Sequence, residues 1–307
     1  MALTERPVRD EADLLSMSAL VHRYPRSHLH VIDLPYRLSS WALDDPENGC
    51  LWIDGDHLAA WAVLQTPFWT VDTACRAEDE QNLIPAILAW AEKRASAIAE
   101  TFYGRPVWFA DVYSRQAERR AALEQAGFAD QINAREDAWS KVLMGRPAEA
   151  PLHPPHLAEG FTIRPLAGEA EVEAYVALHR EVFESRNMTT PWRLRTLLRP
   201  EYIPATDLVA VSPGGELAGF CVGWFDPHGF GGRPSGQIEP MGVRETYRKA
   251  GLGKALLAEC VRRLVNMGAG QVYVETDHQR GPALRLYQSL GFRVIEDVRV
   301  YRKDVIG

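Results

Sequence analysis

The chain has 307 residues, of which 46% are hydrophobic and 24% charged, a composition typical of a globular protein with sizeable cores. Its 34 basic and 41 acidic residues give a net charge of −7, which argues against binding along a phosphate backbone, so we expect no nucleic-acid partner. No apolar run approaches the ~18 residues of a membrane span, and the first residues lack a signal-peptide pattern. The four cysteines have no CxxC spacing. We therefore expect a cytoplasmic protein with no membrane partner, no disulfide and no metal.

A proline-rich stretch divides the chain near its midpoint. Between Gly145 and Gly160 the sequence reads GRPAEAPLHPPHLAEG. Proline lacks a backbone donor and biases the residue before it away from helix, so this stretch is predicted to be a connector. Together with about 150 residues per domain, it predicts a first domain over residues 1–145, a linker over 146–159 and a second domain over 160–307.

The first domain is predicted to alternate helices and strands. In chain order we expect a helix over Glu11–Arg23, strands over Cys50–Ile53, Leu58–Gln65 and Phe68–Ala74, a helix over Gln81–Ala97, a strand over Val107–Val112 and a helix over Gln116–Ala126.

The second domain is predicted to repeat this order. We expect a strand over Phe161–Pro165, helices over Glu169–Phe183 and Trp192–Leu198, strands over Leu208–Val211, Leu217–Trp224 and Gln237–Val243, a helix over Leu252–Met267, a strand over Val272–Thr276 and a helix over Pro282–Leu290. The pairs VWFADV/VYVETD and ALEQAGF/LYQSLGF occupy matching places. We interpret the chain as a tandem duplication of a mixed α/β unit; the alternative is two unrelated α/β domains.

The most informative segment is the turn after the strand that ends at Val243. It carries Arg248, Lys249, Gly251 and Gly253 and leads directly into an apolar-periodic helix. A glycine turn at a helix N-terminus presents unpaired N–H groups and the positive end of the helix dipole. These features, with two cations beside them, predict a binding site for a pyrophosphate. Neither the Walker spacing nor the Rossmann spacing of glycines is present.

Two motifs resemble those of the GNAT superfamily of N-acetyltransferases. Residues 248–253 (RKAGLG) match the family signature R/Q-x-x-G-x-G/A, and residues 283–292 (ALRLYQSLGF) resemble its A-x-x-L-Y-x-x-x-G-F motif. The resemblance implies an α/β (α+β) fold of two tandem mixed-sheet domains, with a splayed central strand pair in the second. It further implies a tandem-domain member with a degenerate first copy and an intact second copy. In the first copy Glu78, Asp79 and Glu80 stand where phosphates need cations.

The resemblance implies acetyl-CoA as co-substrate and direct acetyl transfer to a primary amine of a small molecule or peptide. The cofactor-binding residues it implies are Met241, Gly242, Val243, Arg248, Lys249, Ala250, Gly251, Leu252, Gly253, Lys254, Arg280 and Ala283. Arg280 departs from the family pattern, which often has Asn at this position.

Three residues are candidates for the chemistry. Tyr287 corresponds to the family's thiolate-protonating tyrosine. Glu239 is the first candidate base, because residues 239, 241 and 243 of one strand are expected to share a face. Glu275 on the next strand is the second. For the acceptor we expect an aromatic and polar pocket that includes Trp192 and Trp224.

The same sequence is compatible with two other functions. The chain is a non-catalytic acyl-CoA sensor if it binds the cofactor without transferring the acyl group. It is an acetyltransferase of the mycothiol-synthase kind if the acceptor is the amine of a thiol precursor. We expect a monomer or homodimer.

Overall fold

A computed structural model describes residues 3–25, 28–134, 138–153, 157–279 and 281–305. The chain divides into two compact units, and neither is a continuous segment. The first comprises Met1–Val142, Asp277–Gln279 and Glu296–Gly307, and the second comprises Leu143–Thr276 and Arg280–Ile295. Within the described ranges, every helix is too short or too polar to cross a bilayer.

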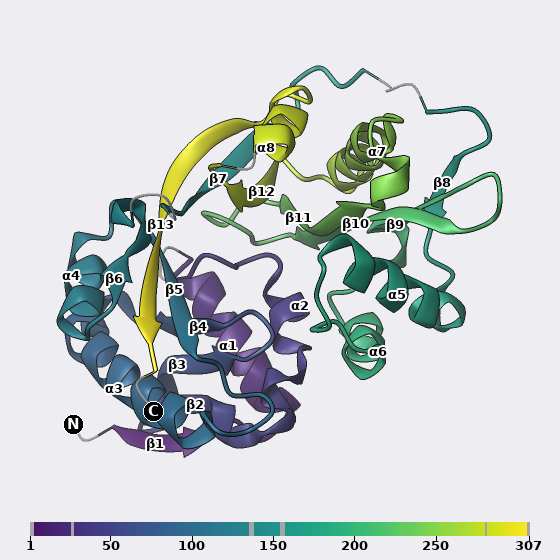
Figure 1. Ribbon diagram of the computed structural model, residues 1–307. Helices are drawn as coiled ribbons and strands as arrows, with labels where there is room; N and C mark the ends of the chain where they lie inside the picture. The colour runs from purple at the N-terminus through teal and green to yellow at the C-terminus, as the bar shows by residue number, and fades with distance from the viewer. Residues whose placement is uncertain (1–2, 26–27, 135–137, 154–156, 280, 306–307) are drawn as a thin grey trace. The chain divides into compact units, whose positions relative to one another are not determined.

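The first unit is a mixed sheet in the order β1-β2-β3-β4-β5-β13, with helices packed on it (Figure 1). Strands β4 and β5 are parallel, and the other neighbours are antiparallel. Its elements are β1 (Thr4–Pro7), α1 (Glu11–Arg23), α2 (Leu34–Leu38), β2 (Gly49–Asp54), β3 (His57–Gln65), β4 (Thr70–Cys75), α3 (Glu80–Ile98), β5 (Val107–Tyr113), α4 (Ala117–Gln125), β6 (Ala129–Asp130) and the later part of β13 (Arg293–Asp304).

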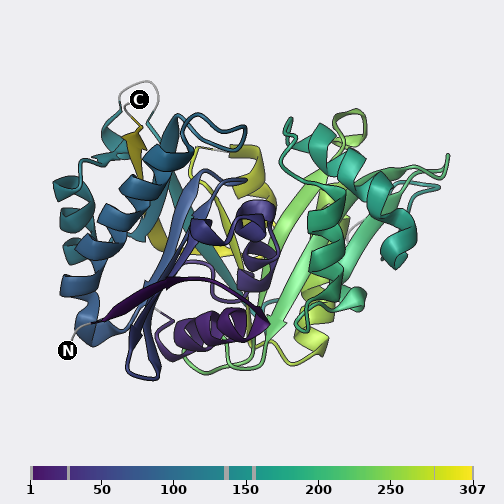
Figure 2. The ribbon, with the colours of Figure 1, turned by 90° about the horizontal axis from the view of Figure 1, so that it is seen from below.

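Successive side chains of β3 show which helix covers each face of this sheet. Trp61 is fully buried and donates its indole N–H to the carbonyl of Met17 on α1, at 3.1 Å. Its neighbours Ala60 and Ala62 pack instead in a core that includes Ile87 of α3. Successive side chains of a strand point to opposite faces, so α1 and α3 cover opposite faces of β3 (Figure 2).

The second unit repeats the order of the first. Its sheet runs β7-β12-β11-β10-β9-β8, and β11 and β12 form a parallel pair, as β4 and β5 do in the first unit. Its elements are β7 (Ser140–Pro147, from Leu143 onward), β8 (Thr162–Pro165), α5 (Val172–Val182), α6 (Thr190–Leu198), β9 (Asp207–Val211), β10 (Leu217–Asp226), β11 (Ser235–Val243), α7 (Leu252–Asn266), β12 (Gln271–Asp277) and α8 (Gly281–Gln288). The predicted mixed α/β class is confirmed.

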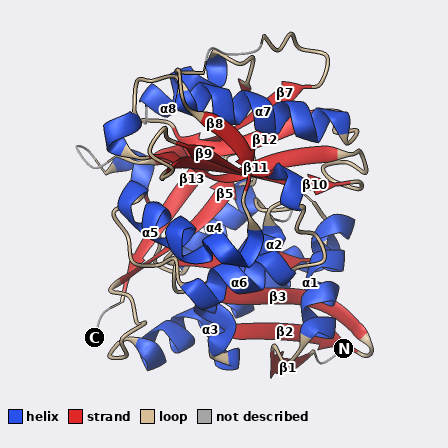
Figure 3. Ribbon diagram, turned by 90° about the vertical axis from the view of Figure 1, so that its right-hand side faces the viewer, coloured by secondary structure: helices blue, strands red, loops and turns tan. Residues whose placement is uncertain are grey.

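Helix α7 lies on one face of β9, β10 and β11, and α5 and α6 lie on the other (Figures 1 and 3). The apolar stripe of α7 faces the sheet, because the four residues that the sequence places on it at helical spacing are all buried: Leu252, Leu256, Cys260 and Leu264.

Strands β11 and β12 part along their length. Their parallel ladder joins Ser235–Gln237 to Gln271–Tyr273, whereas β11 runs on to Val243 and β12 to Asp277. The predicted splayed pair is therefore present in the second unit.

Several strands lie outside the elements expected from the sequence. Strand β13 is rich in charged residues, and from Val298 to Asp304 it pairs with β5 of the first unit. Strand β7 runs to Pro147, two residues past the expected end of the first domain, and it neighbours β12. Each sheet therefore takes its last strand from a part of the chain that the sequence boundaries assign elsewhere.

A buried histidine makes the second unit sensitive to acid. His179 of α5 is stacked on Phe220 with ring centroids 5.5 Å apart, and it also contacts Phe183. Burial, and then the charge of Arg193, lowers the pKa of His179 from 6.5 to about 3. The unfolded chain therefore binds a proton between these values that the folded chain does not bind, so stability is lost as the pH falls below about 6.5.

We expect His179→Phe to reduce this acid sensitivity. Phenylalanine keeps the aromatic packing and does not titrate, so the variant should lose about 2 kcal/mol less unfolding free energy than wild type between pH 7.5 and pH 5. Urea denaturation at the two pH values measures this. The exposed His57→Phe is the control and should leave the pH dependence unchanged. Equal acid destabilisation of wild type and His179→Phe would contradict the expectation.

Candidate active site

A cavity of about 790 Å³ opens in the second unit at the end of β11. The first turn of α7 and one side of α8 line it, together with Val182 and Phe183 at the end of α5. Because β11 and β12 have parted here, the edge of β11 that faces β12 is left without a strand partner beyond Gln237 among the described residues. Such backbone groups need a partner, which an extended ligand can supply.

The turn before α7 has the backbone form of an anion site. Lys249 and Gly251 both have positive φ, 68° and 78°, and Gly251 is the N-cap of α7. Alternation of left-handed and right-handed residues turns successive N–H groups toward one point. The first helical residues, Leu252, Gly253 and Lys254, also lack intrahelical acceptors for their N–H groups. The turn therefore offers several backbone donors at the positive end of the helix dipole.

The side chains of the turn add positive charge. Arg248, Lys249 and Lys254 all line the cavity. The side chain of Arg248 is 52% exposed, and its contact with Glu245 is long, 3.9 Å. Arg244 is engaged elsewhere, because it contacts Glu181 at 3.2 Å and Glu216 at 3.3 Å. The cations available to an anion are therefore those of the turn and of the helix start.

Most of the predicted cofactor residues line this cavity. They are Met241, Gly242, Val243, Arg248, Lys249, Gly251, Leu252, Gly253, Lys254 and Ala283, and Tyr287 lines it as well. Ala250 is not among the lining residues, and Arg280 lies outside the described residues.

The cavity also has walls that the sequence analysis did not identify: Val182, Phe183, Tyr247, Pro282 and Leu286. Leu286 follows Ala283 by three residues and therefore lies on the same face of the helix, so helical spacing could have predicted it as a lining residue. Val182 and Phe183 precede the turn by about sixty residues and belong to neither motif, and no local pattern pointed to them.

Tyr287 is held at the wall by its own helix end. Its ring is half-buried and makes an edge contact with Phe292, with centroids 5.8 Å apart. The N–H groups of Leu290 and Phe292 both bond the carbonyl of Tyr287, at 3.0 and 3.2 Å. The glycine between them, Gly291, has φ 86° and so allows the sharp return of the chain.

Glu239 faces away from Met241 and Val243. The register of β10 and β11 shifts by one residue between Cys221 and Gly223 of β10, which places an extra residue in β11 near Glu239. The alternation that predicted a shared face for residues 239, 241 and 243 is therefore interrupted.

The neighbours of these residues indicate which way each points. Met241 and Val243 lie near the position that a side chain on Gly253 of α7 would occupy. The carboxylate of Glu239 instead acts on Tyr175 of α5, whose pKa is raised by burial and by the charges of Asp207 and Glu239. Gly236 of β11 faces Leu264 of α7, so strand alternation places Glu239 on the opposite face, which α5 and α6 cover. Trp224 fixes its backbone by donating to the carbonyl of Glu239 at 2.7 Å.

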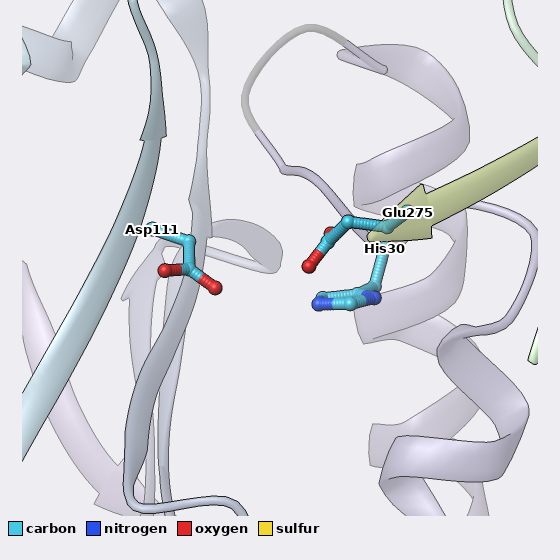
Figure 4. Close-up of side chains that lie close together, drawn as sticks. All are labelled: His30, Asp111 and Glu275. Carbon is cyan, nitrogen blue, oxygen red and sulfur yellow. The ribbon is translucent and has the colours of Figure 1, made fainter. Parts of the chain in front are cut away.

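Glu275 is half-buried on β12, two residues beyond the end of the parallel ladder, and its carboxylate is drawn in Figure 4. It does not line the cavity.

Trp192 and Trp224, expected in an acceptor pocket, are each 1% exposed. They belong to the core between the sheet and α6, because a large apolar ring gains most from complete burial.

The first unit has a different turn at the corresponding place. Glu78 and Asp79 lie in the turn just before α3 and Glu80 is its first residue, and this turn contains no glycine. Asp79 is paired with Arg76 at 2.6 Å, Glu80 with Arg119, and Glu78 accepts from Tyr24 at 3.1 Å. Two of these acids are thus paired with arginines of the unit itself, and the third accepts a hydrogen bond from a tyrosine, which leaves its negative charge in place.

Two potential metal ligands also meet in the first unit. His30 and Asp111 bring ligand atoms within 4.8 Å of each other (Figure 4). His30 Nδ1 already contacts Asp33 at 2.9 Å, and Asp111 is paired with Lys141 at 2.6 Å. The expectation that the chain uses no metal stays a prediction.

Known proteins resemble this chain most clearly in its second half. Residues 172–292 match the model of the Acetyltransferase (GNAT) family. Both motifs that carry the resemblance lie inside this segment, and the resemblance is confirmed. A mycothiol acetyltransferase from Thermobispora bispora is 35% identical over 159 residues, which are 48% of this chain and 52% of that protein. The chain spans about half the length of the curated relatives that it matches.

Solved structures show the same fold over nearly the whole chain. A GCN5-related N-acetyltransferase from Sphaerobacter thermophilus aligns with TM-score 0.64 at 20% identity, covering 99% of this chain and 96% of the other. A tandem GNAT protein from the clavulanic acid biosynthesis pathway aligns with TM-score 0.64 at 13% identity, covering 100% and 99%.

The turn at Gly251 should decide binding of a diphosphate ligand. We expect Gly251→Asp to weaken coenzyme A binding at least tenfold in calorimetry, because it adds a negative charge where the N–H groups converge. Gly251→Asn carries the same backbone strain without the charge and should lose less. Gly268→Asp is the matched control, since Gly268 also has positive φ, 104°, but lies just past the other end of α7. Unchanged affinity in Gly251→Asp would show that the ligand binds elsewhere.

Proposed function

Residues 172–292 form a domain of the GNAT acetyltransferase family, and from this premise we propose that the chain is an acetyl-CoA-dependent N-acetyltransferase. Its acceptor is the primary amine of a small molecule or peptide. The observation that carries the proposal is a single cavity lined both by the left-handed turn at Gly251 and by Tyr287.

The residues present fit acetyl-CoA from end to end. The turn and the start of α7 suit its diphosphate, with Arg248 and Lys249 as neighbouring cations. The unpaired edge of β11 at Met241–Val243 suits its pantetheine arm, which is extended and carries amide groups. Apolar walls such as Leu286 complete the channel toward Tyr287.

The two candidate catalytic groups point to different sides of the parted strands. Tyr287 lies on α8, at the wall of the cavity, and Glu239 points to the face covered by α5 and α6. In the proposed reaction the amine nitrogen attacks the thioester carbon, and the carbon–sulfur bond breaks. The proton of the amine passes through water to Glu239, and Tyr287 gives its phenolic proton to the departing thiolate. Glu275 is the second candidate base.

The first unit has a supporting role in this proposal. Its acidic turn repels a diphosphate, and its arginines are already paired with those acids. We infer one nucleotide site per chain, and the calorimetric stoichiometry should be one coenzyme A per chain.

The relatives favour one acceptor within the proposed class. Several curated relatives at about 30–35% identity carry the name mycothiol acetyltransferase. The amine precursor of mycothiol is therefore the favoured candidate acceptor for this chain, to be assayed beside amino sugars, polyamines and peptides.

Release of free thiol from acetyl-CoA over a panel of amines tests the proposal. We expect turnover with at least one amine and a loss of about 10²-fold in kcat in Tyr287→Phe, because general acid catalysis contributes factors of this size. Affinity for acetyl-CoA should change little. If the chain bound acetyl-CoA but acetylated no amine in the panel, it would be a sensor of acyl-CoA.

Glu239→Gln should change the pH profile as well as the rate. Glutamine keeps the side-chain shape but cannot take a proton, so we expect kcat/KM to fall and the remaining rate to rise with pH, since hydroxide or the free amine then replaces the base. Glu275→Gln is the comparison variant. A larger loss in Glu275→Gln than in Glu239→Gln would assign the base to β12.

A further inference from the structure

Lys249 has a backbone conformation that a lysine rarely adopts. Its φ is 68°, in the left-handed region, and among the described residues only Trp69 and Glu184 share a positive φ without being glycine. In this region the Cβ atom crowds the backbone, whereas a glycine has no Cβ and fits without strain. The fold of the turn alone would therefore favour glycine at position 249. Strain of this kind is kept where the side chain has a function, as in ligand sites.

The ammonium group of Lys249 is available to a ligand. Lys249 is exposed and lines the cavity at the end of β11. It forms no ion pair with any other residue that the structure describes. Lys254, on the first turn of α7, is exposed in the same cavity and is also without an ion pair in the described part of the chain.

The cavity carries more positive charge than a diphosphate requires. A diphosphate diester has about two negative charges, and the backbone donors at a helix start bind such a group even without charged side chains. Arg248, Lys249 and Lys254 add three cations, of which only Arg248 has an acid nearby, Glu245 at 3.9 Å. None of the described residues that line the cavity is acidic. This excess of positive charge favours a ligand with a further anionic group.

From the strained backbone and the excess charge we infer that Lys249 binds the 3′-phosphate of acetyl-CoA and makes the site selective for donors that carry this third phosphate. The inference rests on the proposed acetyl-CoA site. A phosphomonoester has about 1.5–2 negative charges at pH 7, more than either group of the diphosphate. Lysine places a compact charge on a flexible stem, which suits a phosphate at the rim of an open cavity.

Calorimetry with coenzyme A and 3′-dephospho-coenzyme A tests the inference, because the two ligands differ only in this phosphate. The wild-type chain should bind coenzyme A at least about fivefold more tightly, since the second ligand lacks one charge-assisted contact. In Lys249→Ala the two affinities should agree within about twofold, and Lys249→Arg should keep the preference because it keeps the charge. Added salt should reduce the preference of the wild type, because the contact is exposed.

Two further variants separate this role from its alternatives. Lys254→Gln should weaken both ligands by a similar factor and so keep the preference, as expected of a cation that serves the diphosphate. Lys249→Gly should lose the preference as Lys249→Ala does, but it should unfold at a higher urea concentration than Lys249→Ala, because it removes the Cβ atom from the left-handed position. An equal or lower midpoint would show that strain at position 249 is not what the lysine is kept against.

The outcomes distinguish this inference from the proposed function. Equal affinity of the wild type for the two ligands, or a preference that persists in Lys249→Ala, would overturn the role of Lys249 and leave the acetyl-CoA site standing. A preference lost in Lys254→Gln and kept in Lys249→Ala would assign the phosphate to α7 and likewise overturn it. If neither ligand bound, the acetyl-CoA proposal would fail together with the inference.

Discussion

The parting of β11 and β12 after Gln237 and Tyr273 is the constraint on which the second unit depends. A parallel pair that stays joined satisfies its own backbone groups and leaves no room between its strands. Once the strands separate, the exposed edge of β11 needs partners, and the elements that follow each strand stand on either side of an opening. Helix α7 starts at this opening because β11 ends there. Helix α8 faces it because β12 leads into it. The backbone geometry of the two strands therefore creates the cavity, and the side chains only shape its walls.

The parts of this arrangement that local sequence determines were predictable. Gly251 and the residues after it combine a turn, a helix start and an apolar period within about fifteen positions, and each is a short-range property. The direction of the Glu239 side chain was not predictable, since it depends on a bulge in β11 that is seen only when β11 is paired with β10. Val182 and Phe183 are brought to the cavity by the packing of α5 on the sheet. Such contacts between distant segments leave no trace in a single sequence.

The two units show how one order of elements can serve different chemistry. At the start of α7 the backbone turns its N–H groups outward and the neighbouring cations stay accessible. At the start of α3 three acids occupy the turn, and arginines and a tyrosine of the same unit engage them. The acids thereby stabilise the unit's own fold, and the electrostatic sign of the site is reversed. The first unit thus has the same order of strands and helices as the second, but its turn does not favour the same ligand.

The pairing of β13 with β5 bears on how the chain is made. Strand β5 ends at Tyr113, and the strand that pairs with it ends at Asp304. During synthesis the edge of β5 therefore waits for the last part of the chain, roughly 10–40 s at usual translation rates. An unpaired strand edge invites association with other chains. The sheet of the first unit therefore cannot be completed until the end of synthesis. A fragment cut at the proline-rich stretch would lack β13 and keep the edge of β5 unpaired.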